Sequence, residues 1–204
     1  MRGRFKMSGN KKTSLVSLNT EEKDFCEVLA LLRYKQARNK NIKSTLVKYS
    51  KDVLEADREG VFSEMAFCKL AGVYPEFVFT IAVMSVKNGN DYGDVLYKGK
   101  SIDVKSTRHE HGKLISHGVN PNVDYYSLMV GNNGNYRLAG LMKADKLCSK
   151  ERYGLHNVFK RECYKAEQNE LMSWEEFKNG TMAQVTINQS ENSIRKPATE
   201  KEVC

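Results

Sequence analysis

Two stretches of the chain carry apolar residues at the spacing of an α-helix. In the first stretch, intervals of three and four residues connect Phe25, Val28, Leu29 and Leu32. Asn19–Thr20 precedes it and Glu22 follows in the first turn, which is the pattern of a capped helix start. The sequence therefore predicts a helix that begins near residue 20.

The second stretch predicts a helix over residues 57–71 that ends at Gly72, a residue type typical of the position after a helix. Its apolar stripe consists of Val61, Met65, Cys68 and Ala71. Glu64 falls on the same stripe. Because an unpaired carboxylate is costly to bury, Glu64 needs a cation, a metal ion or a hydrogen-bond donor beside it. A structural salt bridge and a functional role both meet this need.

Shorter segments alternate apolar and polar residues and predict strands. Residues 94–97 and 101–107 are separated by Lys98–Gly99, which suits a tight turn. Residues 125–130 and 136–142 flank the sequence GNNGN, a strong turn signal. We therefore expect two hairpins.

Two short helices and one ambiguous segment complete the pattern. The helices are expected near residues 143–150 and 173–178, and Trp174 should anchor the second helix to the body of the domain. Residues 77–86 form an apolar run that suits either a helix or a strand. This order of elements predicts an α/β (α+β) domain built on a mixed sheet.

The composition fits one globular domain. The chain has 204 residues, of which 40% are hydrophobic and 28% are charged. We expect the domain over residues 20–180, between a basic flexible arm over residues 1–19 and a polar tail over residues 181–204. No apolar run has the length of a transmembrane helix, and no apolar stretch follows the basic N-terminus. The five cysteines show no CxxC pair. A cytoplasmic protein without a membrane partner is the expectation.

Positive charge predominates, with 33 Lys and Arg against 25 Asp and Glu and a net charge of +8. Such an excess favours a polyanionic partner such as nucleic acid. Residues 33–51 contain several basic side chains and no acidic one. Either a solvated face or a set of phosphate contacts explains this block. The candidates for phosphate contact within it are Lys35, Arg38, Lys40 and Lys43.

One pair of predicted strands carries candidate chemistry. In residues 101–107, Asp103 and Lys105 share one face, and apolar residues take the other. A two-residue turn at Lys98–Gly99 places Asp94 opposite Asp103, with Cβ atoms about 5 Å apart. Carboxylates that close repel each other unless a cation lies between them, and their hard oxygens suit Mg²⁺ or Mn²⁺. The lysine could stabilise an anionic transition state, or orient and help deprotonate water. Turn-flanking acids on a solvated hairpin are the alternative.

These residues resemble the PD-(D/E)XK nuclease superfamily. Gly93–Asp94 matches the family's Pro–Asp pair, with glycine in place of proline, and Asp103 with Lys105 matches its D/E-x-K element. Glu64 matches the acid of the family's first core helix. The resemblance covers residues 57–147, and no member of the acid, acid and lysine set is missing.

The resemblance implies a restriction-endonuclease-like core, in which a central mixed β-sheet is flanked by helices. It implies that Asp94, Asp103 and the Val104 carbonyl bind Mg²⁺, with Mn²⁺ as a substitute, and that Glu64 supports the metal or the lysine. Lys105 would act on the attacking water. The implied activity is hydrolysis of phosphodiester bonds in DNA, as an endonuclease. Some members of the family cut as dimers, so a homodimer is a further expectation.

Three alternatives stay open. An RNA or tRNA nuclease could use the same site, and a non-catalytic nucleic-acid-binding module could use the same fold. In a basic interaction protein with a motif that arises by chance, Glu64, Asp94 and Asp103 would not converge in space.

Polar residues continue beyond the candidate catalytic strand. The further candidates for nucleic-acid contact are Ser106, Thr107 and Arg108. The following loop contains His109, His111 and His117. Their spacing is a weak zinc signal, and a polar loop beside nucleic acid or a plain surface loop explains them as well.

Overall fold

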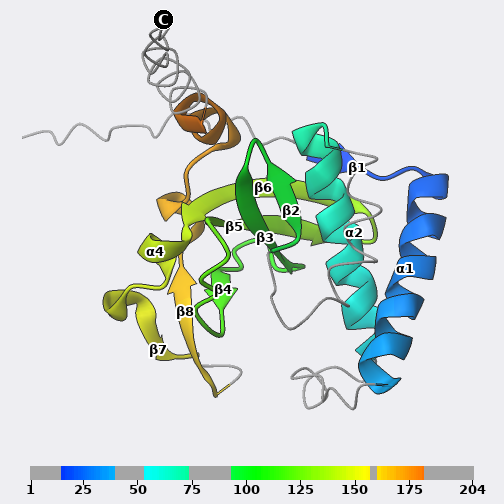
Figure 1. Ribbon diagram of the computed structural model, residues 1–204, viewed down its shortest axis with the longest axis horizontal. Coiled ribbons are helices and arrows are strands. Elements are labelled where there is room, and N and C mark those ends of the chain that lie inside the picture. Colours follow the sequence, from blue (N-terminus) through cyan, green and yellow to red (C-terminus); the bar gives the residue numbers. More distant parts are fainter. Residues whose placement is uncertain (1–14, 40–52, 74–92, 157–159, 182–204) are drawn as a thin grey trace, which may run out of the picture.

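The computed structural model describes residues 15–39, 53–73, 93–156 and 160–181. Figure 1 shows a curved sheet with two long helices on one side and a small second sheet on the other. The helices are α1 (Thr20–Asn39), α2 (Val53–Ala71), α4 (Ala144–Leu147), and the 3₁₀ turns η1 (Lys150–Arg152) and η2 (Gln168–Glu170). The strands are β1 (Leu15–Ser17), β2 (Val95–Tyr97), β3 (Lys100–Thr107), β4 (Leu114–Ser116), β5 (Tyr125–Asn132), β6 (Asn135–Lys143), β7 (Tyr153–Leu155) and β8 (Glu162–Ala166).

The main sheet is mixed, as the sequence predicts. Its strand order is β1-β6-β5-β3-β2, in which β3 and β5 are parallel and the other neighbours are antiparallel. The turn between β2 and β3 is Lys98–Gly99, where both residues have positive φ (48° and 74°). Asn133–Gly134 forms the corresponding turn between β5 and β6. The predicted mixed α/β architecture and both predicted hairpins are confirmed.

The first helix begins where the capping pattern predicts. The Asn19 side chain accepts a hydrogen bond from the Glu22 amide (2.8 Å), and Glu22 accepts one from the Asn19 amide (2.7 Å). The predicted apolar stripe is partly wrong, because Val28 and Leu32 are 57% and 46% exposed. The buried side of α1 instead carries Cys26, Leu29 and Ala30, since this is the side that packs on α2.

The second helix lies between α1 and the main sheet (Figure 1). It begins at Val53, before the predicted residue 57, and ends at Ala71, before Gly72, whose φ of 69° suits the position after a helix. Its buried residues join Ile102 and Val104 of β3 in one apolar cluster. This packing fixes α2 against the strand that carries the candidate chemistry.

The C-terminal helix, residues 174–181, is anchored by Trp174 as predicted. The indole ring lies 5.7 Å from the Phe67 ring and 5.2 Å from the Tyr97 ring, measured between centroids. Ser173 caps the helix, accepting a hydrogen bond from the Glu176 amide and donating from its own amide to the Glu176 carboxylate (2.6 Å). The helix therefore closes the apolar cluster beside β2.

A second, three-stranded sheet has the order β4-β8-β7 and was not predicted. Its strands are antiparallel, and β4 lies in the histidine-containing loop that follows β3. Leu114 and Ala166 of this sheet pack against the face of the main sheet opposite α2. The segment between β3 and β5 is thus held in place beside β3.

The predicted limits of the domain can be compared with the described residues. Residues 15–17, predicted as part of the arm, form β1 and pair with β6, so the domain begins before residue 20. The ambiguous run over residues 77–86 lies outside the described residues, as does the predicted tail beyond residue 181. None of the described helices is long and apolar enough to cross a membrane.

Candidate active site

The backbone at the start of β2 positions Asp94. The Asp94 amide donates to the Ile102 carbonyl (2.9 Å), and the Val104 amide donates to Asp94 Oδ2 (2.7 Å). The carboxylate is therefore tied to β3, the strand that carries Asp103 and Lys105. Only one of its two oxygens takes part in this bond.

Gly93 makes this arrangement possible. Its φ is 80°, and a Cβ atom added there would lie 2.7 Å from Ser101 Oγ and 3.0 Å from the Ile102 carbonyl oxygen. Proline, whose ring fixes φ near −65°, cannot adopt this conformation. A proline at this position would therefore need a different backbone geometry.

Asp103 and Lys105 share a face of β3, as the alternation predicts. Lys105 Nζ lies 2.6 Å from Asp103 Oδ1, and Asp103 is buried. Burial alone would lower the pKa of Lys105, but the carboxylates of Asp103 and Asp94 outweigh it and the pKa is raised. The lysine therefore stays protonated at neutral pH in this arrangement.

Glu64 forms an ion pair with Arg33. Arg33 Nη1 donates to Glu64 Oε1 (2.8 Å) and Nη2 donates to Oε2 (2.5 Å), a two-point contact between α1 and α2. Glu64 is buried and Arg33 is partly buried. The salt bridge anticipated from the sequence is present, and both oxygens of the predicted metal-supporting carboxylate take part in it.

The acids of the motif converge. Burial first, and then the negative charges of Glu64 and Asp103, raise the pKa of Asp94 well above its usual value. Lys105 and the Val104 amide act in the opposite direction. Residues far apart in sequence thus affect the charge of one carboxylate.

The cluster fits a divalent metal ion held by two carboxylates. Within the described ranges, no three His, Cys, Asp or Glu side chains are arranged to hold an ion. Mg²⁺, however, is commonly bound by one or two carboxylates together with water and substrate phosphates. Asp94, Asp103 and the Val104 carbonyl offer hard oxygens of that kind. The unfavourable charge on the buried Asp94 is a feature that a cation would relieve.

The predicted nucleic-acid contacts are only partly placed. Thr107 lies beside Lys105 on a groove described below, and Ser106 and Arg108 are exposed at the end of β3. On α1, Lys35 is exposed and Arg38 belongs to the helix. Two further candidates, Lys40 and Lys43, lie outside the described residues.

The histidines do not form a zinc site among the described residues. His109 and His117 instead line a groove next to Asp103 and Lys105, while His111 does not line it. Sequence analysis missed His156, which joins the same groove from beyond β7. A lone histidine in a polar segment gives no periodic signal that could have revealed this.

Arg33 was also misjudged as one member of a basic block. A signal was present, because Arg33 follows Cys26 by seven residues and Leu29 by four, on the buried side of the helix. A basic residue on a buried stripe needs an acidic partner, and Glu64 is the acid on the facing stripe.

Comparisons with protein-family models, with curated proteins and with solved structures find no match to this chain.

Proposed function

We propose that this protein is a Mg²⁺-dependent deoxyribonuclease that hydrolyses internal phosphodiester bonds. The observation that carries the proposal is the convergence of Asp94, Asp103 and Lys105 at one end of the β2–β3 hairpin. Two acids and a lysine in this order also give the chain its resemblance to the PD-(D/E)XK nucleases. A restriction-endonuclease-like core is part of the proposal.

In this proposal the acids and the lysine have separate roles. Asp94 and Asp103 hold the cation, together with the Val104 carbonyl. The bound metal would supply Lewis-acid stabilisation of the scissile phosphate and lower the pKa of water. Lys105, protonated beside Asp103, donates hydrogen bonds to the attacking water or to a phosphate oxygen and so stabilises the developing negative charge.

Arg33 and Glu64 would support the site from behind. The pair joins α1 to α2, and α2 packs on β3 beneath the candidate catalytic residues. With both oxygens held by the guanidinium, Glu64 contributes fixed negative charge near Asp94. In this proposal Glu64 is a positioning residue, which acts through Asp94.

The decisive experiment measures cleavage by the parent, by Asp103→Asn and by Asp145→Asn, a matched change of an exposed acid on α4. Supercoiled plasmid, linear duplex, single-stranded DNA and single-stranded RNA would be incubated with Mg²⁺, Mn²⁺ or EDTA. We expect metal-dependent DNA cleavage by the parent and Asp145→Asn. The cleavage rate of Asp103→Asn should fall at least about a hundredfold, because the charge stabilisation to which Asp103 contributes acts in the transition state.

Cleavage by Asp103→Asn at the parental rate would overturn the proposed site. Cleavage of RNA alone would replace the substrate with RNA while keeping the site. No cleavage by the parent with either metal, combined with salt-sensitive binding, would favour the non-catalytic nucleic-acid-binding module.

A further inference from the structure

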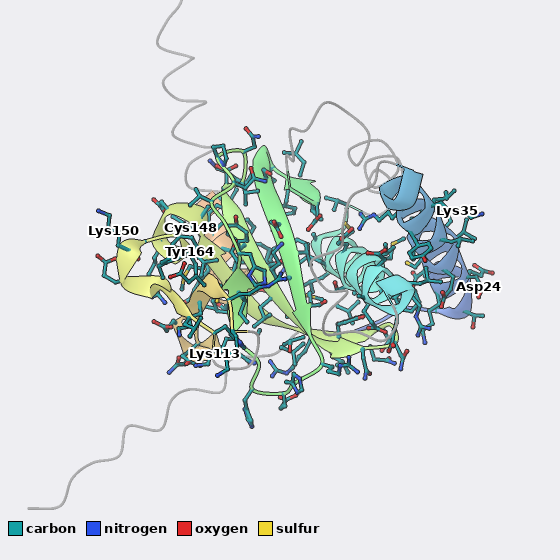
Figure 2. All side chains as sticks on the ribbon, turned by 90° about the horizontal axis from the view of Figure 1, so that it is seen from below. Asp24, Lys35, Lys113, Cys148, Lys150 and Tyr164 are labelled. Atoms are coloured by element: carbon teal, nitrogen blue, oxygen red, sulfur yellow. The ribbon has the colours of Figure 1, made fainter. Side chains whose placement is uncertain are left out.

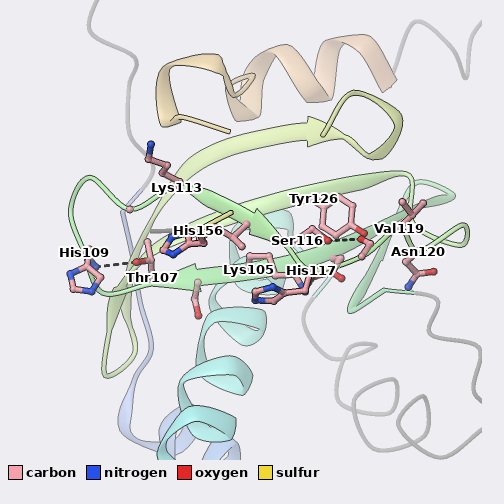
Figure 3. A pocket seen from close by; sticks show the side chains of 15 residues that line it. Lys105, Thr107, His109, Lys113, Ser116, His117, Val119, Asn120, Tyr126 and His156 are labelled. Atoms are coloured by element: carbon pink, nitrogen blue, oxygen red, sulfur yellow. Dashed lines mark hydrogen bonds and ion pairs between the residues drawn. The ribbon is translucent and has the colours of Figure 1, made fainter. Parts of the chain in front are cut away.

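A groove opens on the same face of β3 as Asp103 and Lys105. Figure 3 shows it running along the strand, with Thr107 and His109 at one end and Val119 and Asn120 at the other. One wall is β3, and the other is β4 with the loop that follows it. The groove therefore passes the candidate catalytic residues, because Lys105 lies between its two ends.

The basic side chains along the groove are Lys105, Lys113, His109, His117 and His156. Asp103 is the one acid among the described residues that line it, and it faces Lys105. Lys113 is paired with Glu167, which lies outside the lining. The groove therefore offers a phosphate the donor groups of Lys105 and Lys113, each of which also has an acidic partner.

The outer part of the groove offers flat and apolar surfaces. His117 is exposed, and Val119, two residues further along the chain, is 63% exposed. Burial and the charges of Lys165, His117 and Lys113 lower the pKa of His156, so its imidazole is neutral at neutral pH. Histidine rings can stack on bases, and Asn120 adds an amide of the type that binds base edges.

The size of the groove restricts its occupant. Its volume is about 630 Å³. Sites for small molecules measure about 300–1,000 Å³, so about one or two nucleotides fit. A base that enters the groove beside His117 and Asn120 has to be unpaired, because a paired base is stacked inside the duplex and shows only its edges.

We infer that this groove receives an unpaired nucleotide of the substrate strand, next to the phosphate that Asp103 and Lys105 face. The inference rests on the proposed function, since it takes the occupant to be part of the cleaved strand. Lys113 and Thr107 contact its phosphates, and His117, Val119 and Asn120 contact its base. The protein therefore prefers DNA with unpaired nucleotides over fully paired duplex.

The test is equilibrium binding in EDTA, where no cleavage occurs, measured by fluorescence anisotropy. The labelled probes are a single-stranded DNA oligomer, the same sequence as a paired duplex, and that duplex with one unpaired nucleotide. The variants are His117→Ala in the groove and His111→Ala as the matched control, an exposed histidine of the same loop that does not line the groove. Both changes lie at the surface, and thermal melting verifies that both variants fold.

We expect the parent to bind the two probes with unpaired nucleotides more tightly than the paired duplex. His117→Ala should weaken binding of those two probes by about 5- to 150-fold, the range measured for loss of a base-stacking aromatic group. His111→Ala should stay within about twofold of the parent, as a surface change without a contact. Steady-state cleavage should show the same loss as a raised KM at unchanged kcat.

Equal binding of paired duplex and single strand by the parent, or equal affinities of His117→Ala and His111→Ala, would overturn the inference. Metal-dependent cleavage would still establish the nuclease in that case. His117-dependent binding without any cleavage by the parent would instead overturn the nuclease, and would leave the groove as a site for unpaired nucleotides.

Discussion

At Asp94, function and stability act against each other. The buried carboxylate lies near Glu64 and Asp103, and its pKa is raised, so the folded protein favours its protonated form. Above that pKa the Asp94 carboxylate is charged in both the folded and the unfolded state. The charge costs more free energy in the folded state, where the carboxylate is buried near two other acids. Asp94 therefore lowers the free energy of unfolding as the pH rises through its folded pKa.

We predict that Asp94→Asn abolishes cleavage and raises thermal stability at neutral pH in EDTA. The amide oxygen can still accept the hydrogen bond from Val104 while the repulsion disappears. Each kcal/mol gained raises the Tm by about 2–4 °C in a chain of this size. The advantage should shrink as the pH falls, because the parent then protonates Asp94.

Calorimetry at several pH values measures this, and Mg²⁺ provides the control. Metal binding to the folded state should raise the Tm of the parent and leave that of Asp94→Asn unchanged. A variant less stable than the parent at neutral pH would contradict the account of Asp94.

Gly93→Ala should impair catalysis more than stability. The new Cβ would crowd the Ile102 carbonyl at 3.0 Å and would strain a residue with a φ of 80°. Strain of this kind costs about 1–3 kcal/mol, and a displacement of Asp94 by about 1 Å can cost about a hundredfold in rate.

Gly99→Ala is the matched control. Gly99 also has a positive φ, of 74°, but a Cβ there meets nothing within 4 Å. We expect a similar loss of stability in urea unfolding with cleavage retained. Equal kcat values for the two variants would show that Gly93 has no special role in placing Asp94.

At the scale of elements, Arg33 and Glu64 couple α1 to α2. Arg33→Ala leaves a buried carboxylate without a partner, which costs about 3–5 kcal/mol. Arg33→Lys keeps the charge but loses the two-point contact, so an intermediate loss is expected. Lys35→Ala, an exposed change in the same helix, should cost less than about 0.5 kcal/mol.

Replacing both partners separates stability from activity. Arg33→Met with Glu64→Met should recover most of the lost free energy of unfolding, because apolar side chains can fill the space of an ion pair. Cleavage should remain impaired, because the two-point contact that joins α1 to α2 near Asp94 is gone. Urea unfolding and single-turnover rates measure the two effects. Full recovery of the rate would assign the pair a purely structural role.

Sequence patterning predicted the long elements, both hairpins and the two short helices near residues 143–150 and 173–178, and it missed the second sheet. The two long helices and both hairpins of the main sheet carry periodic or turn signals over many residues. The strands β4 and β7 have three residues each, which is too short for a distinct alternation. Their pairing with β8 is a long-range choice that no local pattern contains.

The candidate site was predicted as far as strand geometry determines it. The alternation in β3 places Asp103 and Lys105 on one face, and the tight turn brings Asp94 to them. The partner of Glu64 and the groove were not predicted. They depend on how α1 packs on α2 and on where the second sheet folds, which are tertiary contacts.

At the scale of the whole molecule, positive charge is spread over opposite sides. Figure 2 shows Lys35 on α1 at one side and Lys150 near the second sheet at the other. Only the first lies in the basic block that we associate with phosphate contacts. The block, and not the net charge of +8, should therefore determine nucleic-acid affinity.

We predict that neutralising the block flattens the salt dependence of duplex binding. The variant carries alanine at Lys35, Arg38, Lys40 and Lys43. Each lost phosphate contact should reduce the slope of log K against log salt by about 0.9, for every duplex sequence alike.

A second variant with the same charge change serves as the control. It carries alanine at the exposed residues Lys143, Lys146, Lys150 and Lys160. Its slope should stay close to that of the parent in anisotropy titrations over a range of salt concentrations. Equal slopes for both variants would show that only the net charge matters.

The hydrogen bond from Val104 to Asp94 has a practical consequence. An amide proton that points at a carboxylate oxygen 2.7 Å from its nitrogen has a chemical shift that follows the charge of that carboxylate. In a ¹⁵N-labelled sample, the Val104 cross-peak would move when Asp94 is protonated and again when a cation binds there. One backbone resonance would thus record the occupancy of the proposed metal site without substrate and without turnover.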